Sequence, residues 1–352
     1  MRTITINTAT PLPPQAAILV IYTGGTLGMG YNAQGVLSPL DFERIQERIP
    51  ELNRFDYEIT VIAFDKPLDS SNIVPNHWLI LAEIIERNYE KFDGFVILHG
   101  TDTMAYTASA LSFLLENLSK PIIFTGAQLP IGQARNDART NFVTALEIAG
   151  SKNAEGKALV PEVCIYFDYF LWRGNRSRKV ESRHFDAFSS QNYPHLAEVG
   201  IDIQYNFSAI MPLPTKPLRV HTQMQNSVGL VKIFPGMPDI FLEKALLEND
   251  LQAIILETYG SGNAPTHEHF LKTLEKAILQ GKILLNISQC YGGMVMQGKY
   301  ETSKSLADMG VVSGKDITTE AAVTKMMFLL GQNLQKKEIQ TLLATSLRGE
   351  MS

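Results

Sequence analysis

The sequence has few cysteines and no long uninterrupted apolar stretch. Only two of its 352 residues are cysteines, too few for a disulfide scaffold or a zinc site, which suits a reducing compartment. Cys164 and Cys290 both follow apolar stretches, so we expect two buried thiols. No apolar stretch approaches the roughly 20 residues that a membrane helix needs. The N-terminal segment also lacks the cleavage site of a secretory signal. We therefore expect no membrane association.

An excess of basic residues is also absent. Lysine and arginine total 31 against 36 aspartate and glutamate residues, a formal net charge of −5, so we expect no nucleic-acid partner. Neither a G-x-S-x-G elbow nor a phosphate-binding P-loop is present, and GSG at 260–262 meets Pro265 where a dinucleotide fingerprint needs its third glycine. His267, Glu268 and His269 lack the spacing of a zinc helix. These absences exclude several common enzyme classes.

Length and composition predict two globular domains. The 352 residues exceed the size at which single cores usually stop growing, and 45% hydrophobic with 19% charged residues is ordinary globular composition. A stretch rich in proline and polar residues interrupts the chain, as interdomain linkers do. We predict a larger N-terminal α/β domain over residues 1–206, a linker over 207–227 and a smaller C-terminal α/β domain over 228–352.

Short apolar runs recur in the first predicted domain. Their near-continuous, β-branched character is typical of parallel strands covered on both faces, and they span residues 17–22, 95–98, 122–124 and 163–167. Residues 104–118 place apolar side chains on one helical face, so we predict a helix there. It lies between the strands at 95–98 and 122–124, and the three elements make a βαβ unit. We therefore predict an α/β fold with a mainly parallel, flavodoxin- or Rossmann-like sheet. The second domain repeats the pattern, with strands at 228–234, 253–256 and 282–287 and helices at 239–248, 266–279 and from 318 onward.

Glycine, hydroxyl and amide residues follow three of these strands, in TGGT at 23–26, HGTDT at 99–103 and TGAQ at 125–128. Ligands of parallel sheets bind beyond the carboxyl ends of the strands, and glycines there let backbone N–H groups approach a developing oxyanion. Thr26, Thr101 and Asp102 are therefore candidate site residues. The alternative is that Thr-Asp-Thr only caps the helix that follows, through Thr103 or Asp102.

A hydroxyl nucleophile needs a group that accepts its proton. His99 stands at the very end of a strand, where we expect a structural hydrogen-bonded role and not catalysis. A desolvated lysine is the other candidate, because burial favours its neutral form. The run RGNRSRK at 173–179 supplies one, although such a run is usually a solvated surface.

Several motifs together resemble the bacterial-type L-asparaginases, most closely the cytoplasmic type I branch. They are TGGTLGM at 23–29, LHGTDTMAYTASAL at 98–111, TGAQLP at 125–130 and YGSGNAP at 259–265. The resemblance extends over almost the whole chain. It implies a cytoplasmic amidohydrolase that converts L-asparagine to L-aspartate and ammonia without a cofactor or metal.

The resemblance also implies catalytic roles. Thr26, on a loop after the first strand, would attack the side-chain amide carbon to give an acyl-enzyme and release ammonia. Thr101, Asp102 and Lys179 would relay protons and position the water that hydrolyses the ester. The family has a loop tyrosine that orients the first threonine. Val36 stands at that position here, and Tyr31 is the candidate replacement.

Substrate binding follows from the same resemblance. Asp102 would hold the α-ammonium of asparagine, and Ser70 and Ser71 would hold the α-carboxylate. Asn263 would complete the pocket of a neighbouring subunit, because the family's active sites lie between subunits of a homo-oligomer, a dimer of dimers.

The sequence leaves two other functions open. A broader glutaminase-asparaginase is one, because a pocket discriminates one methylene by only ~1–3 kcal/mol. A non-catalytic asparagine sensor is the other, and the missing loop tyrosine favours it.

Overall fold

A computed structural model describes residues 1–7, 13–31, 37–39, 49–248, 250–298 and 301–352. These residues divide into two units: the first unit comprises Met1–Ser190 and Pro194–Thr222, and the second unit comprises Gln191–Tyr193 and Gln223–Ser352. The division after Thr222 falls inside the stretch of 207–227. The short segment Gln191–Tyr193 belongs to the second unit, which no sequence pattern indicated.

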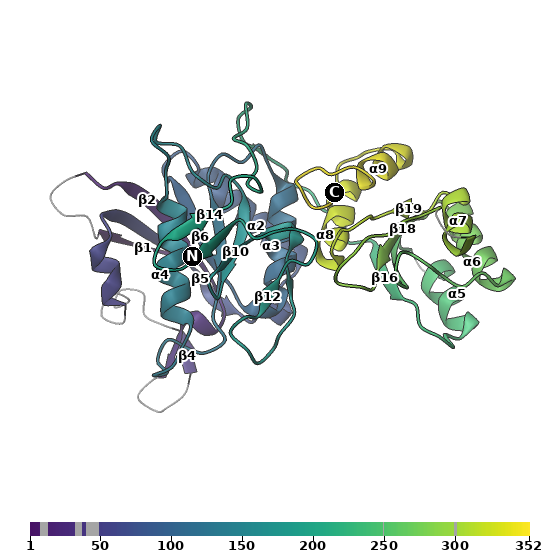
Figure 1. Cartoon of the computed structure of the whole chain (residues 1–352), viewed down its shortest axis with the longest axis horizontal. Helices are drawn as coiled ribbons and strands as arrows, with labels where there is room; N and C mark the ends of the chain where they lie inside the picture. Colours follow the sequence, from purple (N-terminus) through teal and green to yellow (C-terminus); the bar gives the residue numbers. More distant parts are fainter. Residues whose placement is uncertain (8–12, 32–36, 40–48, 249, 299–300) are drawn as a thin grey trace. The chain divides into compact units, whose positions relative to one another are not determined.

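The large sheet of the first unit joins nine of the described strands in the order β1-β5-β2-β6-β8-β9-β10-β13-β14. Figure 1 labels β1, β2, β5, β6, β10 and β14 among them. The five strands from β5 to β9 are mutually parallel. Their chain order is the 2-1-3-4-5 of a flavodoxin-like sheet, so the prediction of that fold class is confirmed. The strands are β1 (Arg2–Asn7), β2 (Ala16–Gly24), β5 (Tyr57–Leu68), β6 (Gly94–Leu98), β8 (Ile122–Thr125), β9 (Val163–Phe167), β10 (Phe170–Arg173), β13 (Ala197–Val199) and β14 (Ile203–Tyr205).

The described part of the first unit has three α-helices: α2 (Pro75–Asn88), α3 (Met104–Leu114) and α4 (Ala138–Gly150). Every residue of β6, β8 and β9 is buried, which requires cover on both faces and explains why these strands carry no polar alternation. Helix α4 packs against β2, β6 and β8, and α3 packs against β9 and α2. The core of the first unit therefore lies along the parallel strands whose ends form the site described below.

Helix α3 is shorter than the helix predicted at 104–118. It ends at Leu114, and β7 (Leu115–Glu116) then pairs antiparallel with β15 (Arg219–Val220). Asn117 takes up a left-handed backbone with φ of 61°, which no helix continues through. Leu115 and Leu118 keep the helical spacing of apolar residues, although the backbone has already left the helix. The predicted helix end was therefore wrong.

Short elements complete the first unit. They are the turns η1 (Thr26–Gly28), η3 (Pro50–Arg54), η4 (Ser70–Asn72), η5 (Thr101–Thr103) and η6 (Gly174–Arg176), and the strands β3 (Met29–Tyr31), β4 (Leu37–Pro39), β11 (Arg178–Lys179) and β12 (Phe188–Ser189). Strand β11 pairs with β12, and β3 pairs with β4. Among these, η1, η4, η5 and β11 carry the candidate site residues.

The second unit is a smaller parallel α/β domain, as predicted. Its strands β16 (Val228–Lys232), β17 (Ala253–Thr258), β18 (Ile283–Ser288) and β19 (Val312–Ser313) lie in sequence order in one sheet. Its helices are α5 (Asp239–Leu247), α6 (Glu268–Leu279), α7 (Glu301–Asp308), α8 (Thr319–Leu330) and α9 (Lys336–Leu343). No helix in the described part of the chain is long and apolar enough to span a bilayer.

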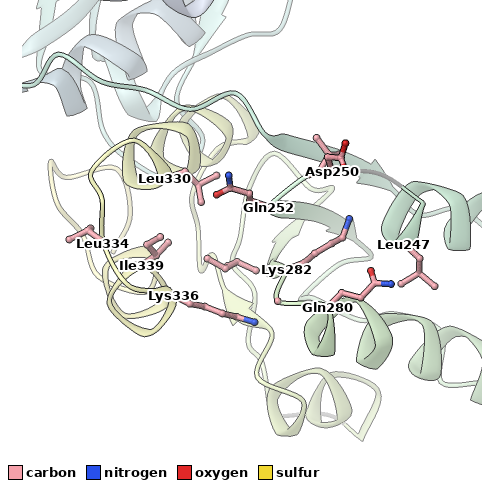
Figure 2. A pocket seen from close by; sticks show the side chains of 12 residues that line it. Leu247, Asp250, Gln252, Gln280, Lys282, Leu330, Leu334, Lys336 and Ile339 are labelled. Carbon is pink, nitrogen blue, oxygen red and sulfur yellow. The ribbon is translucent and has the colours of Figure 1, made fainter.

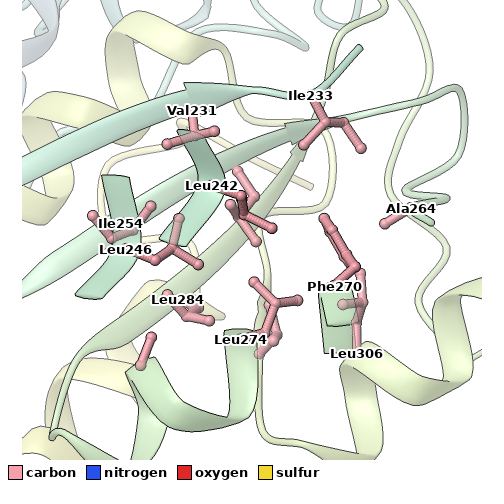
Figure 3. Packing of buried hydrophobic residues seen from close by; sticks show 13 residues of the cluster. Val231, Ile233, Leu242, Leu246, Ile254, Ala264, Phe270, Leu274, Leu284 and Leu306 are labelled. Atoms are coloured by element: carbon pink, nitrogen blue, oxygen red, sulfur yellow. The ribbon is translucent and has the colours of Figure 1, made fainter. Parts of the chain in front are cut away.

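Leucine, isoleucine and phenylalanine side chains from both helices and strands form the core of the second unit. Leu242 and Leu246 of α5 and Leu274 of α6 meet Ile254 and Leu284 of the sheet (Figure 3). The strand and helix positions predicted for this domain are confirmed to within a few residues.

One prediction about the thiols was wrong. Cys164 is buried in β9 as expected, but Cys290 is exposed. Cys290 stands beyond Ser288, the last residue of β18, where the chain turns away from the core. An apolar stretch in the sequence does not fix how soon after its end the chain returns to solvent.

Candidate active site

The candidate site lies at the carboxyl ends of β2 and β6, which are neighbours in the sheet. The chain continues from β2 to β5 on one side and from β6 to β8 on the other, so this is the topological switch point where flavodoxin-like sheets bind ligands. The TGGT and GTDT segments leave the sheet here. The strand order thus brings together two motifs that stand far apart in the sequence.

Glycines let the loops approach closely at this edge. A Cβ on Gly25, whose φ is +89°, would stand 2.6 Å from the backbone nitrogen of Gly100. A Cβ on Gly100 would stand 2.6 Å from the Ser70 Oγ, and one on Gly126 would stand 2.5 Å from the His99 carbonyl oxygen. At Gly25 and Gly126 the added carbon would strike backbone atoms, so glycine is required there, whereas at Gly100 it would strike the Ser70 side chain. The loops after β2, β5, β6 and β8 therefore converge on one place.

Lys179 joins this cluster from β11. Its Nζ donates hydrogen bonds to the Thr101 Oγ1 and the Asp102 Oδ1, both at 2.7 Å. The side chain of Lys179 is 18% exposed, whereas that of Asp102 is 66% exposed. A largely covered amine is thus bound to a hydroxyl on one side and to an open carboxylate on the other. Such an arrangement can transfer a proton between the lysine and the hydroxyl.

The capping alternative does not account for Thr-Asp-Thr. Thr103 occupies the N-cap position of α3 but makes no side-chain hydrogen bond to the helix. Its Oγ1 donates instead to the Ser70 carbonyl oxygen at 2.7 Å, which ties the loop after β5 to the loop after β6. Thr101 and Asp102 face Lys179. The three polar residues therefore organise the cluster and do not cap the helix.

His99 is a structural residue, as expected. Its Nδ1 lies 2.7 Å from the Gly100 carbonyl oxygen, which can only accept, so Nδ1 carries the proton. Its Nε2 then accepts from the Thr107 hydroxyl at 3.0 Å, and that hydroxyl accepts from the Trp78 Nε1 at 3.1 Å. Burial lowers the pKa of His99 to about 4. The neutral ring thus supports the backbone just before Thr101.

Thr26 is placed by its two neighbours. It opens η1 directly after Gly25, which lies against Gly100, and before the buried Leu27. Thr26 itself is half-buried. Val36 lies outside the described residues, and Tyr31 is the last residue of β3. The two threonine loops therefore meet through their glycines.

The two serines differ in what they can offer a ligand. Ser70 is buried beside Gly100. Ser71 is exposed, and its N–H and hydroxyl both donate to the Asp69 Oδ1, at 2.9 and 2.8 Å. These bonds lower the pKa of the Asp69 carboxyl. Ser70 thus lies at the centre of the cluster, while Ser71 closes the turn beside it.

Asn263 belongs to the second unit, whereas the site residues named so far belong to the first. Its backbone exchanges two hydrogen bonds of 2.9 Å with that of Tyr259, which closes the turn after β17. The structure therefore brings together Thr101, Asp102, Lys179 and Ser70 within the first unit, and leaves Asn263 to the second.

Sequence reasoning gave Gln128 no role. The Thr101 hydroxyl points toward its Oε1 at 3.5 Å, and its Nε2 donates to the His184 carbonyl oxygen at 2.9 Å. Its backbone N–H donates to the Asp137 Oδ2 at 2.9 Å. The signal that was available is its position in TGAQ, at the end of β8. No group of three acidic, histidine or cysteine side chains with metal-site geometry occurs among the described residues.

A buried ion pair holds the start of the segment that carries Lys179. Arg173 is the last residue of β10, and its Nε donates to the Glu162 Oε2 at 2.6 Å in an ion pair that is almost fully buried. Its guanidinium also donates to the Ala209 carbonyl oxygen at 2.8 Å. The basic run at 173–179 is thus held at its start by a buried pair, and it is not the solvated surface that such runs usually form.

Comparison with known proteins decides the family. Residues 17–211 match the family described as Asparaginase, N-terminal, and residues 227–343 match the Glutaminase/Asparaginase C-terminal domain. The chain belongs to the asparaginase family. Family membership thus covers both units and includes the loops that carry Thr26, Thr101 and Lys179.

Relatives and solved structures agree with this assignment. The chain is 40% identical to L-asparaginase 1 of Escherichia coli K12, over 96% of this chain and 98% of the relative. It is also 40% identical to a 60 kDa lysophospholipase of Mus musculus, over 98% of this chain but only 64% of the relative. The crystal structure of L-asparaginase I from Vibrio cholerae superposes with a TM-score of 0.86 at 40% identity, covering 96% and 99% of the two chains. The thermostable L-asparaginase of Thermococcus kodakarensis gives 0.87 at 29% identity, covering 96% and 99%.

Proposed function

We propose that this protein hydrolyses L-asparagine to L-aspartate and ammonia at the site between β2 and β6. The observation that carries the proposal is the contact of the Lys179 Nζ with both Thr101 and Asp102 at 2.7 Å. The full-length similarity to E. coli L-asparaginase 1 supports the same reaction.

In the proposed mechanism Thr26 is the nucleophile. Its Oγ1 attacks the side-chain amide carbon of asparagine and its hydroxyl proton passes to the amide nitrogen, so that the carbon–nitrogen bond breaks and ammonia leaves as an acyl-enzyme forms. A water molecule then attacks the ester carbon and gives its proton to Thr101, while the Thr101 hydroxyl passes its own proton to Lys179 and Lys179 gives one of its protons to the departing Thr26 oxygen. The ester bond breaks, aspartate leaves, and the Thr26 hydroxyl is restored. Proximity supports these steps, because the loops of Thr26 and Thr101 meet at Gly25 and Gly100.

The substrate is a zwitterion, so its pocket needs one carboxylate and several donors. Asp102 is two-thirds exposed and open to an α-ammonium group. Ser70 lies beside Gly100, where its hydroxyl can donate to the α-carboxylate. Ser71 completes this set in the proposal, through a hydroxyl that would have to exchange its bond to Asp69 for one to the substrate. The α-amino and α-carboxylate groups would then be held close to the reacting hydroxyls.

Completion of the pocket by Asn263 of a neighbouring subunit belongs to the same proposal, together with a dimer-of-dimers assembly and a cytoplasmic location. The turn closed by Tyr259 and Asn263 holds this side chain on a defined loop of the second unit. Light scattering of the purified protein tests the assembly: a tetramer supports it, and a monomer that turns over asparagine contradicts it.

Glutaminase activity is the second candidate, because the C-terminal match is to a glutaminase/asparaginase domain. The test compares kcat/KM for asparagine and glutamine, with ammonia and the amino-acid product both measured. Ammonia from asparagine, with glutamine slower by about tenfold or more, supports an asparaginase. Similar values for the two amides support the broader enzyme. Calorimetric binding of asparagine without ammonia release contradicts both and identifies a sensor.

A further inference from the structure

A cavity of about 540 Å³ lies at the amino ends of β17 and β18 in the second unit. The chain segments around it are the end of α5, the turn after α6, the end of α8 and the start of α9 (Figure 2). Its volume is within the range of small-molecule sites, which is roughly 300–1,000 Å³. Ligand-sized space thus exists in a part of the molecule to which the proposed reaction gives no role.

The cavity lies at the opposite end of the sheet from Asn263. Gln252 and Ile283, at the amino ends of β17 and β18, line it, whereas Asn263 follows Thr258 at the carboxyl end of β17. The length of β17 separates these ends by about 16 Å. Whatever binds in this cavity therefore binds outside the asparagine site.

The lining combines an apolar wall with cationic groups. Leu330, Leu334 and Ile339 gather at one end of the cavity, and Lys282 and Lys336 extend along it (Figure 2). Lys282 is only 5% exposed, and Lys336 is half-buried. An apolar surface beside partly covered ammonium groups is complementary to a molecule with a hydrocarbon part and an anionic end.

The charges of the lining residues indicate how many negative charges the anionic end of such a ligand should carry. Asp250 is the one carboxylate among the lining residues, and it lies near Lys282, so two lysines against one aspartate leave an excess of one positive charge. Burial lowers the pKa of both lysine ammonium groups, which shows that covering them has a cost. The Lys336 Nζ donates to the Ile278 carbonyl oxygen at 3.3 Å, a neutral partner. A single anion between the lysines would offset that cost.

We propose that this cavity is a binding site for a small amphipathic monocarboxylate, an aliphatic chain with one carboxylate. The carboxylate binds between Lys282 and Lys336, and the chain lies against Leu330, Leu334 and Ile339. The site is separate from the proposed asparagine site and does not depend on that function. Its occupant is a free carboxylate and not a phosphate, because a dianion would exceed the positive charge of the lining.

The test is isothermal titration calorimetry of the full chain with octanoate, without asparagine. Octanoate should bind saturably. Acetate, which lacks the chain, and octanol, which lacks the charge, should each bind at least tenfold more weakly. Lys336→Gln should weaken octanoate binding at least tenfold. Lys337→Gln is the matched control, because Lys337 is the exposed next residue of α9 and does not line the cavity, and it should bind octanoate as the natural chain does.

Three results would overturn the proposal. They are no saturable octanoate binding, octanol binding as tight as octanoate, or equal losses in Lys336→Gln and Lys337→Gln. Lys282→Gln provides a second test, with circular dichroism to show that it folds, since Lys282 is buried. A folded Lys282→Gln protein with unchanged octanoate affinity also contradicts the site. Because asparagine turnover is not the readout, none of these results bears on the proposed hydrolysis.

Discussion

The Lys179 Nζ lies 2.7 Å from the Thr101 Oγ1, although the two residues stand 78 positions apart in the sequence. The contact joins the short strand β11 to the turn η5 at the end of β6. Asp102 binds the same nitrogen at 2.7 Å. Amine, hydroxyl and carboxylate thus form one connected group at the switch point of the sheet.

Thr101→Val should remove activity and leave stability almost unchanged. Valine keeps the shape of threonine but lacks the hydroxyl, so kcat for asparagine should fall at least about 100-fold. A capping threonine would instead contribute about 1 kcal/mol, and losing it would lower the melting temperature by about 2–4 °C. Ammonia release and differential scanning fluorimetry measure the two effects. Near-normal kcat with a clear drop in melting temperature would restore the capping interpretation.

Thr103→Val tests the bond that joins the loop after β6 to the loop after β5. It removes the 2.7 Å bond to the Ser70 carbonyl oxygen but no group of the proposed proton relay. The α-carboxylate contacts should loosen, so KM for asparagine should rise several-fold while kcat changes less. Steady-state kinetics separate the two constants. A loss confined to kcat would show that Thr103 takes part in the chemical step.

Lys179→Met should reduce kcat by at least about 100-fold, because methionine has no group that carries a proton. Stability should fall by less than about 1 kcal/mol, since the partner Asp102 is two-thirds exposed and can be hydrated. Lys157→Met is the control, because the ion pair of Lys157 with Glu155 at 2.8 Å is exposed and neither residue belongs to the candidate site. That variant should turn over asparagine normally. Equal kcat losses in the two variants would contradict a specific role for Lys179.

His99 should make the protein less stable in acid. Its pKa is lowered to about 4 in the folded state, below the value of about 6.5 that an unfolded chain shows. The unfolded state therefore binds more protons between these values, so stability falls as the pH decreases from about 6.5 to about 4, by up to about 3 kcal/mol. His99→Gln lacks this contribution. Urea unfolding at pH 7 and pH 4 should show a smaller pH-dependent loss in the variant, and identical losses would refute the assignment.

The buried pair of Arg173 and Glu162 should be important for stability. Arg173→Met leaves the Glu162 carboxylate buried without its cation, a change that costs about 3–5 kcal/mol. Arg87→Met is the matched control, because Arg87 pairs with Glu83 on the exposed surface of α2 and should cost less than about 1 kcal/mol. Denaturant midpoints measure both variants. Similar midpoints for the two would show that Glu162 finds other partners.

Much of the fold could be predicted from the sequence because buried parallel strands are continuous apolar runs. Strands β2, β6, β8 and β9 were predicted for this reason, whereas β5 was not. Strand β5 carries Asp65 and Lys66, and its carboxyl half is partly exposed, so its pattern is not that of a buried strand. Local composition cannot indicate that β5 borders β2, because strand order is set by how the connections cross the sheet.

The site was predictable only in part. Glycine and threonine at strand ends indicated that the loops of Thr26 and Thr101 belong to one edge. The contact between Thr101 and Lys179 depends on the path of the chain through β9, β10 and β11, which no local pattern encodes. The basic run at 173–179 offered Lys179 as a candidate proton acceptor, but only the resemblance to the L-asparaginases gave it a catalytic role. Gln128 was given no role although TGAQ placed it at a strand end, because a single amide at such a position does not by itself indicate a contact with Thr101.

The central claim is that Thr26 forms the acyl bond at the switch point, beside Thr101 and Lys179. The most direct measurement is ammonia release from L-asparagine by the natural chain and by Thr26→Ala, with asparagine binding followed by calorimetry. The account predicts one ammonia per aspartate from the natural chain, and a variant that still binds asparagine but releases almost none. Undiminished ammonia release by Thr26→Ala, or none from the natural chain, would contradict it.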